Sequence, residues 1–390
     1  MALTKVKLFI PALPGCSRRL LSNLWNPRGL TVGTTQRRNL HSSLHIKNLP
    51  RAQYGGRHTV TVMAGDGVGP ELMAHLQEVF HCAGAPVDFE EVMLNHTTSD
   101  EDYENAVLAV KRNGVAIKGN VETVFDTIGV TSRNLALRAE LDLFANVVCC
   151  KSVKGVETRH NNIDLVVIRE NTEGEYRQLE HENVDGVIES LKIITAKGSN
   201  RIAKYAFDYA VRHGRKKVTA VHKANIMKLG DGLFLECCHQ MSKNYPDVEF
   251  DSLIVDNCSM QMVSKPQQFD VILLPNLYGN IIANIGAGLV GGPGMVPGLN
   301  VGELYAVFET GTRNTGRHVA GKNLANPSAM LLAGADMLDY LGLGYHGDLI
   351  HNAVNSVLGD GKFHTPDIGG TALTTDVVSE IIRRIEYEGC

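Results

Sequence analysis

Residues 58–71 read H-T-V-T-V-M-A-G-D-G-V-G-P-E, and they predict the fold class. The first six residues alternate β-branched residues with others, which predicts a strand. Three glycines then predict a tight turn, and Pro70 suits the first turn of a following helix, where its missing N–H has no helical partner. The spacing is G-x-G-x-G-P, which matches the G-x-G-x-x-G dinucleotide fingerprint poorly. A strand, turn and helix in this order favour an α/β fold.

The same alternation continues along the chain. Short apolar runs at residues 164–168, 217–221 and 271–274 predict buried strands. Residues 201–210 place five apolar side chains on one helical face. Strands that alternate with amphipathic helices again predict an α/β architecture.

The first 57 residues differ in composition from the rest of the chain. They contain ten Lys or Arg residues and no Asp or Glu, and the first acidic residue is Asp66. A basic, acid-free segment rich in Ser and Thr is typical of a mitochondrial transit peptide, and we expect cleavage near Leu40. The alternative is a disordered basic arm that binds nucleic acid or an anionic surface.

Charge and hydropathy restrict the functions of the remaining 333 residues. The whole chain has 38 basic and 42 acidic residues, so removal of the ten basic ones leaves 28 and 42, a net charge of −14. This acidic balance argues against nucleic acid as a partner. No apolar run reaches the 18 or more residues of a membrane span, so no membrane association is expected. The length is sufficient for two domains.

Two carboxamides are expected to share one helix face. Residues 275–284 read P-N-L-Y-G-N-I-I-A-N, with Asn280 and Asn284 one helical turn apart. Mg²⁺ and Mn²⁺ prefer carboxylate oxygens, and an Asn offers an oxygen without the charge. One unit-charge pair at ~4 Å and an effective dielectric of ~20 is worth about 4 kcal/mol. Two such residues therefore predict a weak metal site.

Two arginines are candidates for binding a carboxylate ligand. Residues 132–138 read S-R-N-L-A-L-R and end at Arg138, and residues 168–176 read I-R-E-N-T-E-G-E-Y and include Arg169. A guanidinium group binds a carboxylate through two parallel hydrogen bonds, so a pair of arginines makes a plausible cradle for a di- or tricarboxylate.

These motifs, together with V-H-K-A-N-I-M-K at residues 221–228, resemble the isocitrate/isopropylmalate dehydrogenase family of β-decarboxylating dehydrogenases. The resemblance runs from about residue 58 to the C-terminus. It implies an α/β fold without a Rossmann domain. A large domain would comprise residues 58–152 and 280–390, and a smaller domain, residues 153–279, would carry a clasp that forms a dimer.

The resemblance also implies roles for individual side chains. In the family, Tyr176 and Lys223 would handle the protons of hydride transfer and decarboxylation, and Lys223 and the metal ligand Asp256 would be lent across the dimer. The residues that would receive the substrate or citrate are Asn120, Thr123, Ser132, Asn134, Arg138 and Arg169. Taken singly, Lys223 would be interpreted as a surface charge, and Asn134 or Thr123 as a turn or helix-cap residue.

Three parts of the expected active site depart from the family. Val148 stands in place of a third substrate arginine, and Asn280 and Asn284 replace two metal-binding aspartates. The loop at residues 310–322, T-G-T-R-N-T-G-R-H-V-A-G-K, differs from the coenzyme loop and is one residue longer. Because three parts have changed, we expect a site without turnover. The residues that serve a neighbour's site, Lys223 and Asp256, are retained.

Within the family, the 310–322 loop and P-N-L-Y-G-N resemble the regulatory subunits of mitochondrial NAD-dependent isocitrate dehydrogenases. This implies a heteromer in the mitochondrial matrix with a catalytic alpha and a beta subunit. Citrate and ADP would be activators, NAD would bind only at the catalytic subunit, and Mg²⁺ or Mn²⁺ would bind with Asp256 supplied in trans. A further Mg²⁺ would bridge citrate and ADP. The ADP-contacting residues would be Arg313, Asn314, Thr315 and Asn326.

Two other functions stay open. The chain could be a structural assembly subunit with inactive ligand sites, or a self-sufficient isocitrate dehydrogenase that uses Asn ligands. Two departures lie in the expected citrate site: Leu135 replaces an expected Asn, and the turn between Thr123 and Ser132 is one residue short and lacks prolines.

Overall fold

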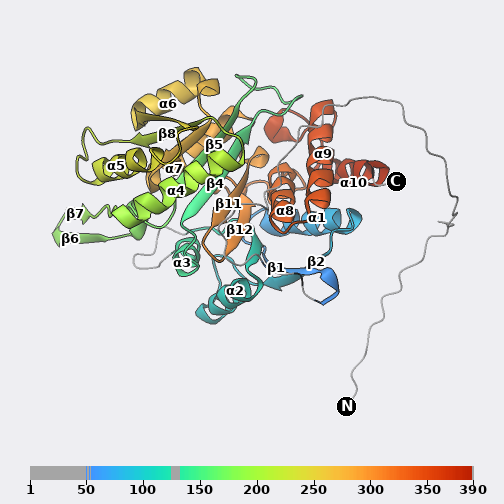
Figure 1. The fold of residues 1–390 in the computed structure, drawn as a ribbon. Coiled ribbons are helices and arrows are strands. Elements are labelled where there is room, and N and C mark those ends of the chain that lie inside the picture. The colour runs from blue at the N-terminus through green and yellow to red at the C-terminus, as the bar shows by residue number, and fades with distance from the viewer. Residues whose placement is uncertain (1–49, 51, 53, 124–131, 389–390) are drawn as a thin grey trace, which may run out of the picture. The chain divides into compact units, whose positions relative to one another are not determined.

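A ten-stranded mixed sheet organises this computed structural model (Figure 1). The structure describes residues 50, 52, 54–123 and 132–388, all within one compact unit of residues 38–390. The strand order is β2-β1-β3-β12-β11-β4-β5-β10-β8-β9. Strands near both edges are parallel to their neighbours, whereas β12, β11, β4 and β5 in the middle form three antiparallel pairs. The predicted α/β class is confirmed.

Strands and helices alternate through most of the described residues. The strands are β1 (His58–Met63), β2 (Val87–Val92), β3 (Val115–Lys118), β4 (Ala145–Lys151), β5 (Asp164–Glu170), β6 (Glu180–Val184), β7 (Val187–Ser190), β8 (Lys217–His222), β9 (Glu249–Ile254), β10 (Val271–Leu274), β11 (Pro297–Val301) and β12 (Ala306–Thr310). The helices are α1 (Gly69–Cys82), α2 (Asp100–Asn113), α3 (Arg133–Glu140), α4 (Ala196–Arg212), α5 (Gly230–Ser242), α6 (Val255–Ser264), α7 (Asn276–Leu289), α8 (Ser328–Tyr340), α9 (Gly344–Asp360) and α10 (Thr374–Glu388).

The glycine-rich turn joins β1 to α1, as its sequence predicts, and Pro70 lies in the first turn of α1. Gly67 has a positive φ of 61°, and a Cβ at this position would lie 1.9 Å from the carbonyl oxygen of Thr315. The backbone N–H of Val68 donates to the same oxygen at 2.9 Å. Only glycine permits this close approach, which fixes the turn against the 310–322 loop.

The other predicted elements are also present. The runs at residues 164–168, 217–221 and 271–274 lie in β5, β8 and β10, and residues 201–210 lie in α4. The core strand β10 is fully buried, and α7 begins after Pro275. Helix α4 is capped by the Thr195 hydroxyl, and its apolar face is buried. Burial of that face stabilises the helix more than its intrinsic propensity does.

Strands from the N-terminal and the C-terminal parts of the described chain lie next to one another in one half of the sheet. Strands β1 to β4, β11 and β12 occupy six consecutive positions, and β5, β8, β9 and β10 occupy the other four. Helix α8 packs against α9, and α10 packs against α9 and α1 (Figure 1). The division into domains at residues 58–152, 153–279 and 280–390 stays a prediction.

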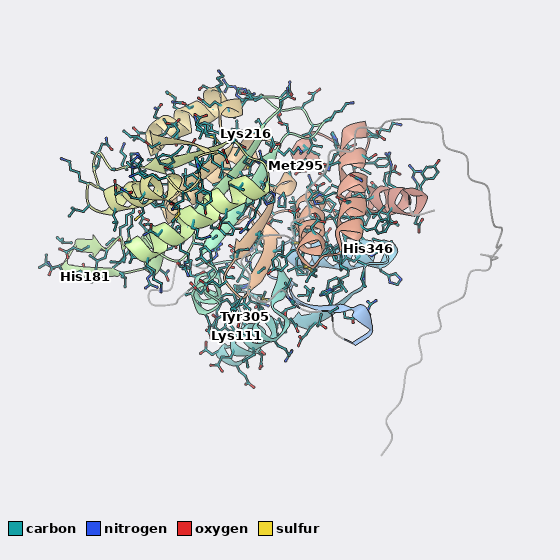
Figure 2. All side chains as sticks on the ribbon, viewed as in Figure 1. Lys111, His181, Lys216, Met295, Tyr305 and His346 are labelled. Atoms are coloured by element: carbon teal, nitrogen blue, oxygen red, sulfur yellow. The ribbon has the colours of Figure 1, made fainter. Side chains whose placement is uncertain are left out.

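A separate two-stranded hairpin, β6–β7, lies in the segment where the clasp is predicted. All residues of both strands are exposed, including apolar Val184, Val187 and Ile188. His181, labelled in Figure 2, pairs with Glu189 across the hairpin at 2.9 Å. A role of this hairpin in dimer formation stays a prediction.

Some predictions fall on residues that the structure does not describe. They are residues 1–49, 51 and 53 of the predicted transit segment, with its cleavage near Leu40, and the short turn at residues 124–131. Among the described residues, no helix combines the length and apolar character needed to cross a membrane.

Candidate anion-binding site

Arg138 and Arg169, the two predicted carboxylate-binding residues, are both almost fully buried. Arg138 lies on α3, and its Nη1 donates to Oδ1 of Asn171 at 2.6 Å. Arg169 lies on β5, and its guanidinium group lies 4.6 Å from the centroid of the Tyr176 ring. Burial lowers the pKa of Arg169 to about 10, so this side chain stays charged at neutral pH.

Helix α7 fixes the guanidinium group of Arg169. Nε and Nη2 of Arg169 both donate to Oδ1 of Asn276, at 2.9 and 2.6 Å, and Nη1 donates to Oδ1 of Asn280 at 2.8 Å. A Cβ at Gly279 would lie 2.6 Å from side-chain carbons of Arg169, so glycine is needed for the helix to approach this closely. Asn280 therefore faces a cation in this structure.

Asn280 and Asn284, which stand in place of two metal-binding aspartates, make other contacts. The Asn280 oxygen accepts from Arg169, and the exposed Asn284 amide donates to the backbone oxygen of Asn280 at 2.8 Å. Two neutral amides beside a buried guanidinium group do not suit a divalent cation, which would be repelled by that charge. The residues of this chain alone do not fit the metal site of the family.

Behind Arg138 lies a buried carboxylate that sequence reasoning missed. Glu309, on β12, accepts at Oε2 from Lys118 Nζ at 2.7 Å and at Oε1 from Asn300 Nδ2 at 2.7 Å. Arg138 Nη2 lies 3.4 Å from Oε1. Burial alone would raise the pKa of Glu309, but Lys118, Arg138 and Arg313 hold it well below its usual range. The carboxylate is therefore ionised inside a cationic environment.

Arg313 of the 310–322 loop contributes a further positive charge to the same region. Burial, followed by repulsion from Arg313, lowers the pKa of Arg138 well below its ordinary value. Repulsion from Arg313 also acts on Arg169 and Lys118. Within the described part of the chain, Nη2 of Arg313 is buried and has no hydrogen-bond partner. We call Arg138, Arg169 and Arg313 the anion cradle.

The 310–322 loop is held by Asn120. The side-chain amide of Asn120 donates towards Oγ1 of Thr310 at 3.0 Å and towards the carbonyl oxygens of Thr312 and Asn314 at 3.1 and 3.0 Å. Because an amide has two N–H groups for these three acceptors, the hydrogen bonds are shared. Asn120 follows Lys118 by two residues, so it reaches the loop from the end of β3.

The other residues predicted to contact ADP surround this loop. Asn314 is exposed, and its Oδ1 accepts from the backbone of Gly316 at 3.0 Å. The backbone oxygen of Thr315 contacts Val68, as described above. Asn326 is buried and donates to Oδ2 of Asp367 at 3.1 Å. The structure does not join Asn326 to the loop by any hydrogen bond among the described residues.

Three further predicted citrate residues contact each other or the backbone. Oγ1 of Thr123 lies 2.9 Å from Oγ of Ser132, across the ends of the segment 124–131. The Asn134 amide donates to the carbonyl oxygen of Val121 at 2.7 Å. These contacts match the turn-stabilising interpretation of Thr123 and Asn134, and their role towards a ligand stays a prediction.

Lys223 and Asp256, predicted to serve another subunit, lie together. Lys223 Nζ lies 2.7 Å from Oδ1 of Asp256, and the Lys223 backbone N–H donates to Oδ2 of the buried Asp231 at 2.7 Å. Asp231 also pairs with Lys192 at 2.9 Å. Sequence reasoning did not identify Lys192 or Asp231, although Asp231 follows the H-K-A-N-I-M-K motif closely.

Val148, which stands in place of the third arginine, belongs to the core. It is fully buried in β4, and its Cγ1 would lie 2.9 Å from a Cβ built on Gly311. No space remains for a longer side chain without displacement of the strand or the loop.

Comparison with known proteins places the chain among dehydrogenases. Residues 59–382 match the model of a family described as isocitrate/isopropylmalate dehydrogenase. The chain is 58% identical over 357 residues to the mitochondrial isocitrate dehydrogenase [NAD] subunit gamma 1 of Rattus norvegicus, with 91% of this chain and 90% of that protein covered. It is 53% identical over 338 residues to the mitochondrial isocitrate dehydrogenase [NAD] subunit beta of Homo sapiens, with 86% of this chain and 88% of that protein covered.

A solved structure agrees with the fold. The crystal structure of isocitrate dehydrogenase from Methylococcus capsulatus superimposes with a TM-score of 0.80 at 39% identity, covering 84% of this chain and 99% of that one. The motifs predict in particular a resemblance to the gamma subunit of mitochondrial NAD-dependent isocitrate dehydrogenases, or to a close paralogue of it, and this resemblance is confirmed.

Proposed function

Because the chain belongs to the isocitrate/isopropylmalate dehydrogenase family, we propose that it is a regulatory subunit, without turnover of its own, of a NAD-dependent isocitrate dehydrogenase in the mitochondrial matrix. In that enzyme the catalytic alpha subunit converts isocitrate to 2-oxoglutarate and CO2 in the tricarboxylic acid cycle and alone binds NAD. This chain assembles with the alpha subunit and a beta subunit. It binds citrate and ADP as allosteric activators.

The contact between Asn280 and Arg169 carries this proposal. The amide oxygen of Asn280 accepts a hydrogen bond from the guanidinium group but does not neutralise it. A carboxylate at this position would either pair with Arg169 or bind a divalent cation. With an amide, the charge of Arg169 remains available to an anionic ligand. The surroundings of Arg169 are therefore better suited to hold a carboxylate than to hold the metal ion that the reaction of the family requires.

The charges around the anion cradle support citrate as its ligand. The anion cradle and Lys118 supply four cations, and the carboxylate that faces three of them is Glu309. A ligand with three carboxylates brings enough negative charge to neutralise this excess. Guanidinium groups can bind its carboxylates through paired hydrogen bonds, which fix the orientation of the ligand.

The 310–322 loop supports ADP as the second ligand. Arg313 has a buried Nη2 without a partner among the described residues, and a diphosphate oxygen could accept its hydrogen bond. Arg317 adds a second, exposed positive charge, which pairs with Glu122 at 3.0 Å. Asn314, Thr315 and Asn326 remain the proposed side-chain contacts to ADP. Citrate and diphosphate oxygens together would supply the anionic ligands for a bridging Mg²⁺.

Lys223 and Asp256 would complete the active site of the catalytic partner. Lys223 is half-buried and Asp256 is exposed, and in the described part of the chain the hydrogen bond of the Lys223 side chain goes to Asp256 and not to the anion cradle. Asp256 would then supply a carboxylate to the Mg²⁺ or Mn²⁺ of the partner, and Lys223 would take part in its proton transfer.

An activity assay tests the proposal. We would co-express this chain with a catalytic alpha subunit and measure isocitrate-dependent NADH formation with and without citrate plus ADP, alongside the chain alone. We expect no turnover by the chain alone and a lower apparent KM for isocitrate when both activators are present. Arg138→Gln should abolish the response to citrate. Arg133→Gln, on the same helix but paired outside the cradle with Asp100, should retain it.

The alternatives give different results. An active pair that ignores both effectors would identify a structural assembly subunit with inactive ligand sites. Turnover by the chain alone would identify a self-sufficient dehydrogenase and would overturn the argument from Asn280 and Val148.

A further inference from the structure

Two buried ions connect the anion cradle with the strands behind it. Lys118 and Glu309 are each 3% exposed, and their Nζ and Oε2 atoms lie 2.7 Å apart. The other oxygen of Glu309 faces Arg138 at 3.4 Å and accepts from Asn300 at 2.7 Å. Arg138 also donates to Asn171, which in turn donates to Asn300 at 3.1 Å. The carboxylate of Glu309 thus limits how the Arg138 guanidinium group can turn.

The same strands lead directly into the 310–322 loop. Strands β3 and β12 pair in parallel, with Phe308 opposite Ile117, so Lys118, the last residue of β3, and Glu309, the penultimate residue of β12, lie at the same edge. Thr310 follows Glu309, and its hydroxyl donates to the carbonyl oxygen of Thr312 at 3.2 Å. The backbone that positions the Glu309 carboxylate is therefore the backbone that begins the loop.

Asn120, which follows β3, links that strand to the same loop. It lies two residues after Lys118, and its amide reaches Thr310, Thr312 and Asn314. Lys118 also donates to the carbonyl oxygen of Gly119 at 2.9 Å, which restrains the backbone between the two residues. A displacement of the Lys118–Glu309 pair would therefore move Asn120, which holds the loop, and Thr310, where the loop begins.

Electrostatic repulsion is the interaction through which the loop and the cradle affect each other. Arg313 of the loop acts on Arg138, Arg169, Lys118 and Glu309, all of which are buried. Charges in a buried region are screened weakly, so they interact more strongly than surface charges. Without a ligand, the cations of the cradle repel Arg313, and Glu309 is the carboxylate that offsets this repulsion for Arg138 and Lys118.

We propose that Glu309 is a positioning residue that, with Lys118, couples the anion cradle to the 310–322 loop, so that a ligand at one of them changes the affinity for a ligand at the other. This inference rests on the proposed function, in which citrate and ADP occupy these two places. An anion in the cradle relieves the repulsion between Arg138, Arg169 and Arg313. The loop is then held in one conformation, and ADP binds with a smaller loss of conformational entropy.

Calorimetry on the complex of this chain with a catalytic alpha subunit tests the inference. Citrate is titrated in Mg²⁺ buffer with and without saturating ADP, and the ratio of the two Kd values is the coupling ratio. Titration of ADP with and without citrate must give the same ratio. We expect at least about a fivefold ratio in the wild-type complex, at the lower end of ordinary allosteric coupling.

Two variants and one control separate the possible causes. Glu309→Gln keeps the shape and the acceptor oxygen but removes the charge, and we expect the ratio to fall to about one while both ligands still bind. Thr310→Val removes the hydroxyl link to Asn120 without altering a charge, and it should lower the ratio even if Glu309→Gln does not fold. Glu140→Gln makes the same substitution in the partly exposed ion pair with Lys111, which Figure 2 labels, and should retain the wild-type ratio.

The outcomes are distinguishable. If the wild-type complex binds neither citrate nor ADP, the proposed function fails, and this inference fails with it. If it binds both and the ratio is one, or the ratio survives in both variants, Glu309 does not couple the sites and the proposed function stands. Loss of the ratio in Glu140→Gln as well would also overturn the inference.

Discussion

Lys223 Nζ lies 2.7 Å from the Asp256 carboxylate, so two side chains expected to serve a second subunit form an ion pair with each other. The side chains are 27% and 68% exposed, respectively. An exposed ion pair of this kind is screened by water and contributes little to stability, so either member can exchange its partner at little cost. The backbone of Lys223 is held separately by the buried Asp231. The backbone of Lys223 is therefore fixed, whereas the charged ends of the Lys223 and Asp256 side chains can rearrange.

Lys223→Met tests whether this pair serves the catalytic partner. We expect kcat of the heteromer to fall about 10²-fold or more, because general acid–base groups contribute roughly 10²–10⁴-fold. Citrate affinity should not change, because Lys223 lies outside the anion cradle. The measurement is steady-state NADH formation at saturating isocitrate. Lys243→Met, a matched change at an exposed lysine after α5, should leave kcat unaltered, and an equal kcat in both variants would rule out the role of Lys223.

Asn280→Asp should weaken citrate binding. The new carboxylate would lie where Oδ1 now accepts from Arg169 at 2.8 Å, and it would neutralise that guanidinium group. At an effective dielectric of ~20, a unit-charge pair near 4 Å is worth about 4 kcal/mol, so we expect at least a ~10-fold rise in Kd. Calorimetry with citrate in metal-free buffer measures this directly.

The control for this change is one helical turn away. Asn284→Asp makes the same substitution at an exposed residue that contacts the Asn280 backbone and not Arg169. It should change citrate affinity less than Asn280→Asp. Equal effects of the two variants would mean that net charge alone, and not the contact with Arg169, determines affinity.

Local patterns predicted the elements well because burial follows their periodicity. The alternation at residues 58–63 and the apolar face at 201–210 each specify one element without reference to the rest of the chain. The helix that carries Asn280 and Asn284 was also predicted. The different surroundings of these two residues were not, because one turn along a helix is ~5.4 Å and only one of them reaches Arg169.

The buried ion pair could not be predicted in the same way. Lys118 and Glu309 are distant in sequence and meet only because β3 and β12 pair. A lysine and a glutamate taken singly are most often surface residues, so the sequence alone does not predict that these two are buried. The sequence indicates their importance only indirectly. Lys118 lies two residues before the predicted ligand contact Asn120, and Glu309 directly precedes the 310–322 loop.

His222 predicts a pH dependence of stability. Its Nδ1 accepts from the Ala224 backbone N–H at 3.0 Å, which requires an unprotonated nitrogen. Burial lowers the pKa of His222 from 6.5, with Asp231 opposing the shift. The unfolded chain therefore binds this proton more readily, so the contribution to stability is complete above about pH 6.5 and declines as the pH falls below it.

His222→Asn keeps an acceptor at the position of Nδ1 and removes the titration. The melting temperature of the variant should fall less than that of the wild type between about pH 7.5 and pH 5.5. Differential scanning calorimetry at several pH values measures both. Parallel curves for the two proteins would show that His222 does not titrate in this range.

Asn120→Ala should loosen the 310–322 loop and weaken ADP binding. The amide of Asn120 is the side-chain donor that reaches Thr310, Thr312 and Asn314 together. Removal of a buried donor leaves its acceptors unsatisfied, at about 1–3 kcal/mol, which corresponds to a roughly 5- to 150-fold loss of ADP affinity if the loop must be ordered to bind. Hydrogen exchange should increase at residues 311–316, whereas exchange in the fully buried strand β10 should not change. Faster exchange in β10 as well would indicate global destabilisation, and the loss of affinity could not then be assigned to the loop.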